Sequence, residues 1–305
     1  MKKILIPLLI LLIMAATAMA AGPMDGPVAI EGHAVVADLP EALLLIVFGC
    51  VVGLIGTLIG AGGGFIHVPM LMIFFNFTPQ LAIGTSITAV FMNALSGTFS
   101  YVTHKRIDYD IGLKFATAAV PGVLVGAVVA QHFTFTTFSI FFSVTLMLLS
   151  LHLFAEKDIS IMLTNVPEKP EVRLLIDAEG ETHLYAPDMS IGLAGSFFTG
   201  IFSGLFGIGG GIIHVPLMYS VLGMPVHIAT ATSHFILAIT SFFAVVVFTG
   251  MHEIDLDFAI FIGVGAILGA YFGARMSRKT RPRSIKRAIA VCLLLLAIKL
   301  ITGVM

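Results

Sequence analysis

Gly60-Ala61-Gly62-Gly63-Gly64-Phe65-Ile66-His67-Val68-Pro69 recurs 147 residues later as Gly207-Ile208-Gly209-Gly210-Gly211-Ile212-Ile213-His214-Val215-Pro216. Each copy interrupts a strongly apolar stretch of the chain. Adjacent glycines disfavour a helix by roughly 1 kcal/mol each relative to alanine. Inside a membrane, such a break is tolerated mainly where the freed backbone lines a cavity or is buried in protein. Matched breaks in two halves of one chain are typical of a transporter's binding site.

The composition predicts a membrane protein. Hydrophobic residues make up 58% of the 305-residue chain, charged residues only 11%, and the mean hydropathy is +1.06; soluble domains carry about 25% charged residues. The 17 acidic residues fall in the N-terminal extension, in loops or, for Glu41, Asp110 and Asp257, at the very start of an apolar segment. Lys114 and Lys299 also lie near the ends of apolar segments. Because no carboxylate is left for the hydrocarbon core, we exclude a carboxylate-based proton pump and a carboxylate metal site. The net charge of -1 gives no indication of a nucleic-acid partner.

An N-terminal segment precedes eight expected spans. Residues 1–20 have the pattern of a signal peptide, with Lys2 and Lys3 before an apolar run and Ala18-Met19-Ala20 as the cleavage site. An uncleaved anchor helix is the alternative, and either one places residues 21–40 in an extracytoplasmic extension. The spans are expected at about 41–75 (broken), 80–102, 110–131, 134–154, 189–222 (broken), 226–250, 256–275 and 285–303.

The two halves match well beyond the glycine phrase. At the same offset, Thr85-Ser86 pairs with Thr232-Ser233, and Ile107-Asp108 pairs with Ile254-Asp255. The sequence therefore predicts an all-α polytopic membrane protein of about eight transmembrane helices. They form two four-helix repeats, 41–154 and 189–305, and the first helix of each is broken at the Gly-rich turn. The linker 155–188 is expected to hold a small β-hairpin around Glu179-Gly180.

Lysine and arginine predict the orientation. Residues 275–287 hold seven basic and no acidic residues, so we place this loop in the cytoplasm. Counting each broken stretch as one crossing puts residue 41 and the linker 155–188 outside. The alternative is that each glycine stretch is a re-entrant hairpin that returns to the same side of the membrane. With residue 41 outside, we expect that arrangement to place the basic loop outside as well, so we prefer single crossings. Two parallel repeats, related by an axis along the membrane normal, follow from that count.

The glycine phrase favours a site for a small anion. It lacks the Gly-Lys-Ser/Thr ending of a P-loop. A break exposes backbone N–H groups, and the half-helix that follows presents its positive N-terminal end. The candidate backbone positions are Gly62, Gly63, Gly64, Gly209, Gly210 and Gly211. Close helix packing is the structural alternative, and it is the role expected for Gly122, Gly126, Gly269 and Gly273.

Neutral side chains near the breaks complete the candidate substrate site. His67 and His214 lie one turn into each half-helix, where they could bind an anion or carry a proton; capping freed carbonyls is the alternative. The second spans add further polar groups: Thr85, Ser86, Asn93, Thr232, Ser233 and His234. Ser and Thr in membrane helices often only bond their own carbonyls. His234 has no counterpart in the first half, where Ile87 stands.

These features together resemble the TauE/SafE sulfite exporter family. The chain shows a broken first span whose Gly-rich phrase runs into His and Pro, then an Ala-x-x-Thr-Ser helix, then the whole unit again, over about 41–304. The resemblance implies an ion-coupled secondary transporter of the inner membrane, for a small anion such as sulfite or sulfoacetate. We predict no enzymatic activity, metal or cofactor. The signal and the hairpin-bearing linker depart from the compact family pattern. A passive anion channel and a membrane-embedded sulfur relay using Cys50 are the alternatives.

Overall fold

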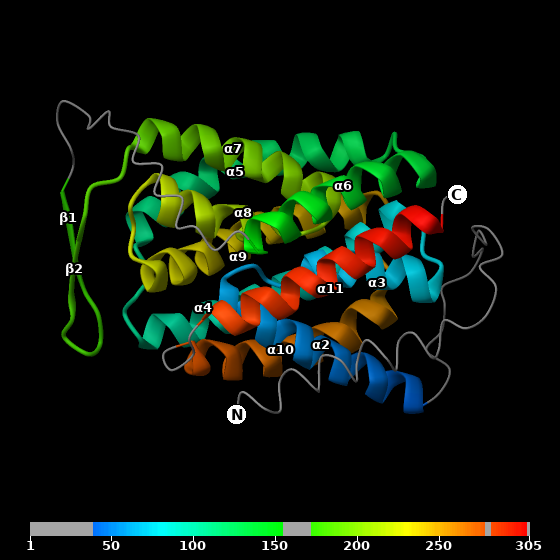
Figure 1. Cartoon of the computed structure of the whole chain (residues 1–305), viewed down its shortest axis with the longest axis horizontal. Coiled ribbons are helices and arrows are strands. Elements are labelled where there is room, and N and C mark those ends of the chain that lie inside the picture. The colour runs from blue at the N-terminus through cyan, green and yellow to red at the C-terminus, as the bar shows by residue number, and fades with distance from the viewer. Residues whose placement is uncertain (1–38, 155–171, 278–281, 304–305) are drawn as a thin grey trace.

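The computed structural model describes residues 39–154, 172–277 and 282–303, which form a helical bundle with one small hairpin at its end (Figure 1). The first half holds α2 Leu39–Ile59, α3 Gly64–Phe75, α4 Pro79–Thr103, α5 Tyr109–Ala130 and α6 Phe135–Phe154. The second holds α7 Met189–Phe206, α8 Gly211–Pro216, the π-helix η1 Leu217–Val221, α9 Val226–Gly250, α10 Leu256–Met276 and α11 Pro282–Thr302. Strands β1 Arg173–Ile176 and β2 Thr182–Tyr185 pair antiparallel.

The predicted class, an all-α membrane protein with a β-hairpin between its halves, is confirmed. Six of the described helices are long and apolar enough to cross a membrane: α2, α4, α5, α7, α9 and α10. The described part of α6 and that of α11 are apolar over a shorter stretch, so the count of eight spans is not confirmed. The predicted signal peptide, most of the extension 21–40 and the first half of the linker lie outside the described residues.

The sequence repeat becomes a repeat of local structure. Asp108 caps the N-terminus of α5 by accepting from the Ile111 N–H at 3.0 Å, and Asp255 caps α10 by accepting from the Phe258 N–H at 3.1 Å. A carboxylate at this position satisfies one of the N–H groups that a helix start leaves unpaired. The two matched aspartates therefore fix where the third helix of each half begins.

Each glycine phrase reverses the chain. Gly62 and Gly63 have φ of 75° and 96°, a left-handed backbone that suits glycine. After this turn α3 runs back along α2, because Gly63 lies against Val52 and the His67 ring lies 5.4 Å from the Phe48 ring. The pair α2–α3 is a re-entrant hairpin whose arms reach the same end of the bundle (Figure 1).

The second phrase does the same. Gly210, with φ of 73°, lies against Ser203 near the end of α7, and Leu217 lies against Gly195 two turns further back. The return arm, α8 followed by η1, therefore retraces α7. The prediction that each broken stretch is one crossing is wrong in both halves, because left-handed glycines turn the chain back.

The two repeats are inverted relative to each other. The Thr85 hydroxyl, near the start of α4, accepts from the backbone N–H of Asp255 beyond the end of α9 at 3.0 Å. The Thr232 hydroxyl, near the start of α9, accepts from the Asp108 N–H beyond the end of α4 at 3.1 Å. α4 and α9 are thus antiparallel, and the relating axis lies in the membrane plane. The predicted parallel arrangement is wrong, because it followed from counting each break as a crossing.

The β-hairpin and the start of the basic loop lie at the same end of the bundle. The Ala178 N–H donates to the His104 carbonyl at 3.0 Å, and Arg275 lines a groove together with Thr103 at the end of α4. The prediction that puts 275–287 and the linker on opposite sides is therefore wrong. Two re-entrant turns remove two crossings, which leaves residue 41 and the basic loop on opposite sides. The expectation that such turns would export this loop is wrong as well.

Glycines bring two pairs of parallel helices to backbone contact. A Cβ on Gly269 would overlap the carbonyl oxygen of Cys50 on α2, and Gly273 packs in the same way one turn on. Gly122 and Gly126 of α5 stand in the same relation to α7. Small residues are the usual means of close helix approach in membranes. The packing role predicted for these four glycines is confirmed.

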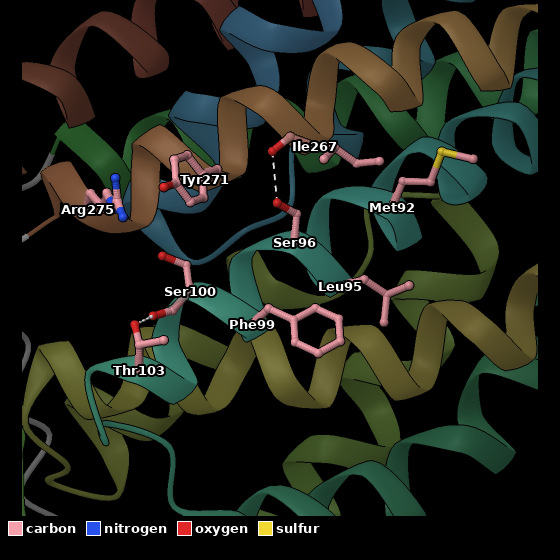
Figure 2. Close-up of a pocket in the computed structure, with 9 residues that line it drawn as sticks. All are labelled: Met92, Leu95, Ser96, Phe99, Ser100, Thr103, Ile267, Tyr271 and Arg275. Atoms are coloured by element: carbon pink, nitrogen blue, oxygen red, sulfur yellow. Dashed lines mark hydrogen bonds between the residues drawn. The ribbon is translucent and has the colours of Figure 1, made fainter.

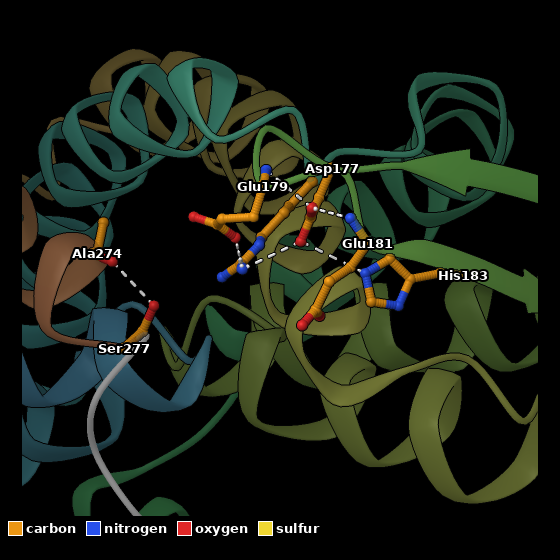
Figure 3. A network of polar contacts seen from close by, with 7 residues as sticks. Asp177, Glu179, Glu181, His183, Ala274 and Ser277 are labelled. Atoms are coloured by element: carbon orange, nitrogen blue, oxygen red, sulfur yellow. Dashed lines mark hydrogen bonds and ion pairs between the residues drawn. The ribbon is translucent and has the colours of Figure 1, made fainter.

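A buried ion-pair network connects the β-hairpin to the α4–α5 loop (Figure 3). Arg106 lies 3.2 Å from Asp177 and 2.5 Å from Glu179, and the Asp177 carboxylate also accepts from the N–H groups of Glu179 and Glu181. Burial alone would raise the pKa of Asp177, but the Glu181 N–H and the Arg106 guanidinium outweigh it and hold that pKa at about 2. Because docking lowers this pKa from 3.8, the carboxylate stabilises the docked hairpin at neutral pH. Its contribution is lost as the pH falls towards 2.

Single cysteines introduced at loops test the inverted arrangement. In a Cys50→Ser, Cys292→Ser background, we expect Val172→Cys and Ser277→Cys to react with a membrane-impermeant maleimide from one side. His132→Cys and Glu253→Cys should react from the other side. Single crossings would instead put 172 opposite 277 and 132 opposite 253, so either of those results would contradict the re-entrant fold.

Candidate functional site

The two glycine turns meet inside the bundle, in register. Gly64 lies against Gly207, and Gly211 lies against Gly60, so closely that a Cβ on Gly64 or Gly211 would overlap a carbonyl oxygen of the other turn. The two breaks face each other as the repeat leads one to expect. At these four residues, however, the turns are in direct contact, so an anion has no space between them.

The predicted serines of the second spans hold this contact together. Ser86 donates to the Gly207 carbonyl at 3.2 Å, and Ser233 donates to the Gly60 carbonyl at 3.0 Å. Each serine belongs to one repeat and each carbonyl to the other. Thr85 and Thr232 bond the loops of the opposite repeat, as described above. The structure thus brings all four hydroxyls close to the breaks and gives each a cross-repeat partner.

Asn93 is also fully engaged. Its side-chain oxygen accepts from the Thr57 hydroxyl at 3.1 Å, and its amide donates to the carbonyls of Gly53 and Ala266 at 3.1 and 3.2 Å. The residue is completely buried. It therefore ties α2, α4 and α10 together and has no donor to spare for a substrate in this conformation.

Three buried histidines have ring nitrogens with no hydrogen-bond partner among the described residues. Neither ring nitrogen of His67 is paired, and the ring packs against Phe48. His214, at the matching position, has an unpaired Nε2. His234 Nε2 lies 3.3 Å from the Thr57 hydroxyl, but its Nδ1 is unpaired. An unpaired buried polar group costs roughly 1–3 kcal/mol, so these nitrogens are strong candidates for contact with a ligand.

A row of hydroxyl groups on α7 lies beside the second turn. Thr199 and Ser203 lie against Gly210, as does the Nδ1 of His214, and Ser196 is one turn further back along α7. The hydroxyls of Ser196 and Ser203 are buried and unpaired among the described residues. Thr199 donates to its own helix at the Gly195 carbonyl. The second hairpin therefore gathers two unpaired hydroxyls and one unpaired imidazole nitrogen.

Ser196, Thr199 and Ser203 are not among the residues predicted from the repeat. The spacing of 196, 199 and 203 puts the hydroxyls on one helical face, which was a usable signal. The same offset gives the α2 counterparts Gly49, Val52 and Gly56, so the hydroxyls occur in one half only. A search for features shared by the two halves passes over them for that reason.

The return arms of the two hairpins also differ. α3 is a regular helix of 12 residues, whereas α8 lasts six residues and continues as the π-helix η1. Single π-helical turns are rare and occur often at functional sites. The irregular arm and the unpaired hydroxyls thus belong to the same hairpin.

Three neighbouring side chains of the β-hairpin have the residue types of a metal site. Asp177, Glu181 and His183 offer ligand atoms within 4.8 Å of one another. The Asp177 carboxylate already accepts from Arg106 and from two backbone N–H groups, and His183 Nε2 lies 3.5 Å from it. A guanidinium at this position repels a cation, so we interpret the group as the anchor of the β-hairpin.

The chemistry available at the α7–α8 hairpin is that of neutral hydrogen-bond donors. His214 is the one ionisable side chain on either arm that could carry a positive charge, and neither arm has a carboxylate. Hydroxyls, imidazole and backbone N–H groups can replace the hydration of a small anion. Cys50 lies elsewhere, with its backbone against Gly265 and Gly269 of α10.

Comparison with known proteins gives a consistent family. The model of a family described as sulfite exporter TauE/SafE matches residues 45–300. The probable membrane transporter protein YunE of Bacillus subtilis is 35% identical over 266 residues, which cover 85% of this chain and 97% of that relative. A probable membrane transporter protein of Methanocaldococcus jannaschii is 23% identical over 258 residues, covering 80% of this chain and 89% of the relative. No solved structure matches the chain.

The contact between the turns can be tested by adding one methyl group. Gly211→Ala should lower stability by roughly 1–3 kcal/mol, the usual effect of overpacking, because the new Cβ meets the Gly60 carbonyl. Gly250→Ala is the matched control, since nothing lies near its Cβ position. Thermal unfolding of the two purified variants measures the difference. Equal melting temperatures would contradict the close contact.

Proposed function

Since the chain belongs to the sulfite exporter TauE/SafE family, we propose that it is a secondary transporter that moves a small anion across the bacterial inner membrane. The relatives are probable membrane transporters. The observation that carries the anion assignment is the group of unpaired polar atoms on the α7–α8 hairpin, namely the Ser196 and Ser203 hydroxyls and the His214 Nε2. This group is built to give hydrogen bonds and offers no carboxylate to a cation.

The substrate class is sulfite, sulfoacetate or a related sulfur-containing or organic anion, and its transport is ion-coupled. Oxyanions of this kind accept several hydrogen bonds at once, which matches a site of two hydroxyls and an imidazole. The absence of a carboxylate on α7 and α8 removes the repulsion that would exclude an anion. The family description names sulfite, and the site's chemistry is compatible with it.

The substrate site is proposed to centre on the second hairpin. Ser196, Ser203 and His214 bind the anion directly, and the backbone of Gly209, Gly210 and Gly211 lets it approach. The cross-repeat bonds of Ser86 and Ser233 position the two turns. His67 lies on the more apolar first hairpin, and His234 lies beside Thr57. We propose that these two histidines add polar groups on either side of the site.

The end of the bundle that carries the β-hairpin is proposed to face the cytoplasm. That end holds Lys105, Arg106, Arg173 and the basic loop 275–287, whereas the loops 76–78, 131–134 and 251–255 at the other end hold no lysine or arginine. Basic loops favour the cytoplasmic side. Residue 41 is then extracytoplasmic, as a preceding signal peptide or anchor requires.

The proposal is tested by counterflow of labelled sulfite into proteoliposomes, with sulfate, thiosulfate, sulfoacetate and acetate as competitors. We expect saturable uptake and competition from at least one sulfur oxyanion. Collapse of the proton gradient should reduce uphill uptake; flux unaffected by any ion gradient would identify a passive channel. Normal uptake by a Cys50→Ser variant is expected, and its loss would favour the sulfur relay.

Substitutions on α7 test the location of the site. Ser203→Ala and Ser196→Ala should each weaken apparent substrate affinity by roughly 10- to 100-fold, because a hydrogen bond to a charged group contributes about 1.5–3 kcal/mol. Thr145→Ala is the control, since this exposed hydroxyl bonds its own helix at the Phe141 carbonyl. Unchanged affinity in both serine variants would exclude this site while leaving the transporter assignment intact.

A further inference from the structure

A groove of about 440 Å³ runs between α4 and α10 on the outer surface of the bundle (Figure 2). Its volume is within the range of small-molecule sites, roughly 300–1,000 Å³. Ser96 donates to the Ile267 carbonyl at 2.8 Å and joins the two helices along its length. Leu95 and Phe99 form an apolar wall, and Phe99 is 72% exposed. The groove therefore opens towards lipid, away from the glycine turns.

A cation lies at one end of this groove. The Arg275 guanidinium sits 4.3 Å from the centre of the Tyr271 ring, and it makes no ion pair with any residue that the structure describes. Ser100 and Thr103 line the same end. None of the lining residues is acidic, and the chain has no acidic residue after Asp257. The groove thus changes along its length from apolar to cationic.

The symmetry-related surface, between α9 and α5, has no such site. The positions equivalent to Ser96 and Ser100 are Phe243 and Val247, and that equivalent to Arg275 is Val128. The corresponding surface between α9 and α5 is therefore apolar throughout. A groove needed only for helix packing would keep the same character in both halves. The cationic end is therefore a feature of only one of the two symmetry-related surfaces.

We propose that this groove binds one anionic phospholipid. Its phosphodiester group lies at Arg275 and Tyr271, and an acyl chain follows Leu95 and Phe99. The position fits this occupant, because Arg275 stands at the end of α10, where a membrane helix meets the headgroups. Basic pockets between transmembrane helices are the usual sites of such lipids. This proposal is independent of the transported substrate.

Lipid titration of the purified full chain in neutral detergent tests the proposal, with native mass spectrometry or thermal unfolding as readout. Phosphatidylglycerol should bind and stabilise more than phosphatidylcholine with the same acyl chains. Arg275→Gln should weaken this preference about fivefold, the effect of about 1 kcal/mol for one cation near a lipid surface. Lys299→Gln is the matched control, since it removes the same charge from the last turn of α11.

Three results would overturn the proposal. Equal binding of both lipids would remove the role of the phosphodiester charge, and wild-type preference in Arg275→Gln would remove this residue as its partner. Stabilisation by glycerol phosphate alone would identify a site for a soluble anion instead of a lipid. Tyr271→Leu, which introduces the residue found at the equivalent position 124 of the first repeat, should lose part of the preference and keep the fold.

Discussion

The backbone contact between the two glycine turns is the constraint on which the rest of the structure depends. Gly64 can lie against Gly207, and Gly211 against Gly60, only because none of these residues carries a side chain. The contact brings both hairpins to one place inside the bundle. Ser86 and Ser233 then bond across it, each to the other repeat. The inverted pairing of α4 and α9 follows, because each helix must present its first turns to the opposite repeat's glycine turn.

Much of this fold could be predicted from sequence, because it depends on patterns that repeat locally. The spans, the aspartate caps at 108 and 255, and the β-hairpin around Gly180 are set by short-range residue chemistry. The relative orientation of the two repeats, parallel or inverted, cannot be predicted in this way. A turn such as Gly62-Gly63 interrupts a helix whether the chain continues or reverses, and only the φ values and the contact of His67 with Phe48 distinguish the two.

The candidate site shows the same division. The repeat predicts that the glycine turns and the hydroxyls of the second spans lie together, and Ser86 and Ser233 do bond the turns of the opposite repeat. Thr85, Ser86 and Asn93 prove to be engaged in bonds within the protein, which no sequence pattern reveals. Ser196 and Ser203 escaped notice because their counterparts are Gly49 and Gly56. The residues that the two repeats share build the fold, whereas the side chains proposed to bind a ligand occur where the repeats differ.

Unpaired polar groups distinguish the α7–α8 hairpin, where we propose the substrate site. Ser196, Ser203 and His214 each leave a buried polar group without a partner among the described residues, at roughly 1–3 kcal/mol apiece. The fold tolerates this cost because the close contacts elsewhere, between α5 and α7 and between the two turns, hold the groups in place. In the proposed site, an anion that accepts from the Ser196 and Ser203 hydroxyls removes the cost of these two groups. An apolar molecule of equal size does not, so the unpaired groups of the proposed site favour a polar ligand. The first hairpin has Val52 and Gly56 at the matching positions. Among its described residues only His67 has unpaired buried nitrogens, so the first hairpin is the more closely packed of the two.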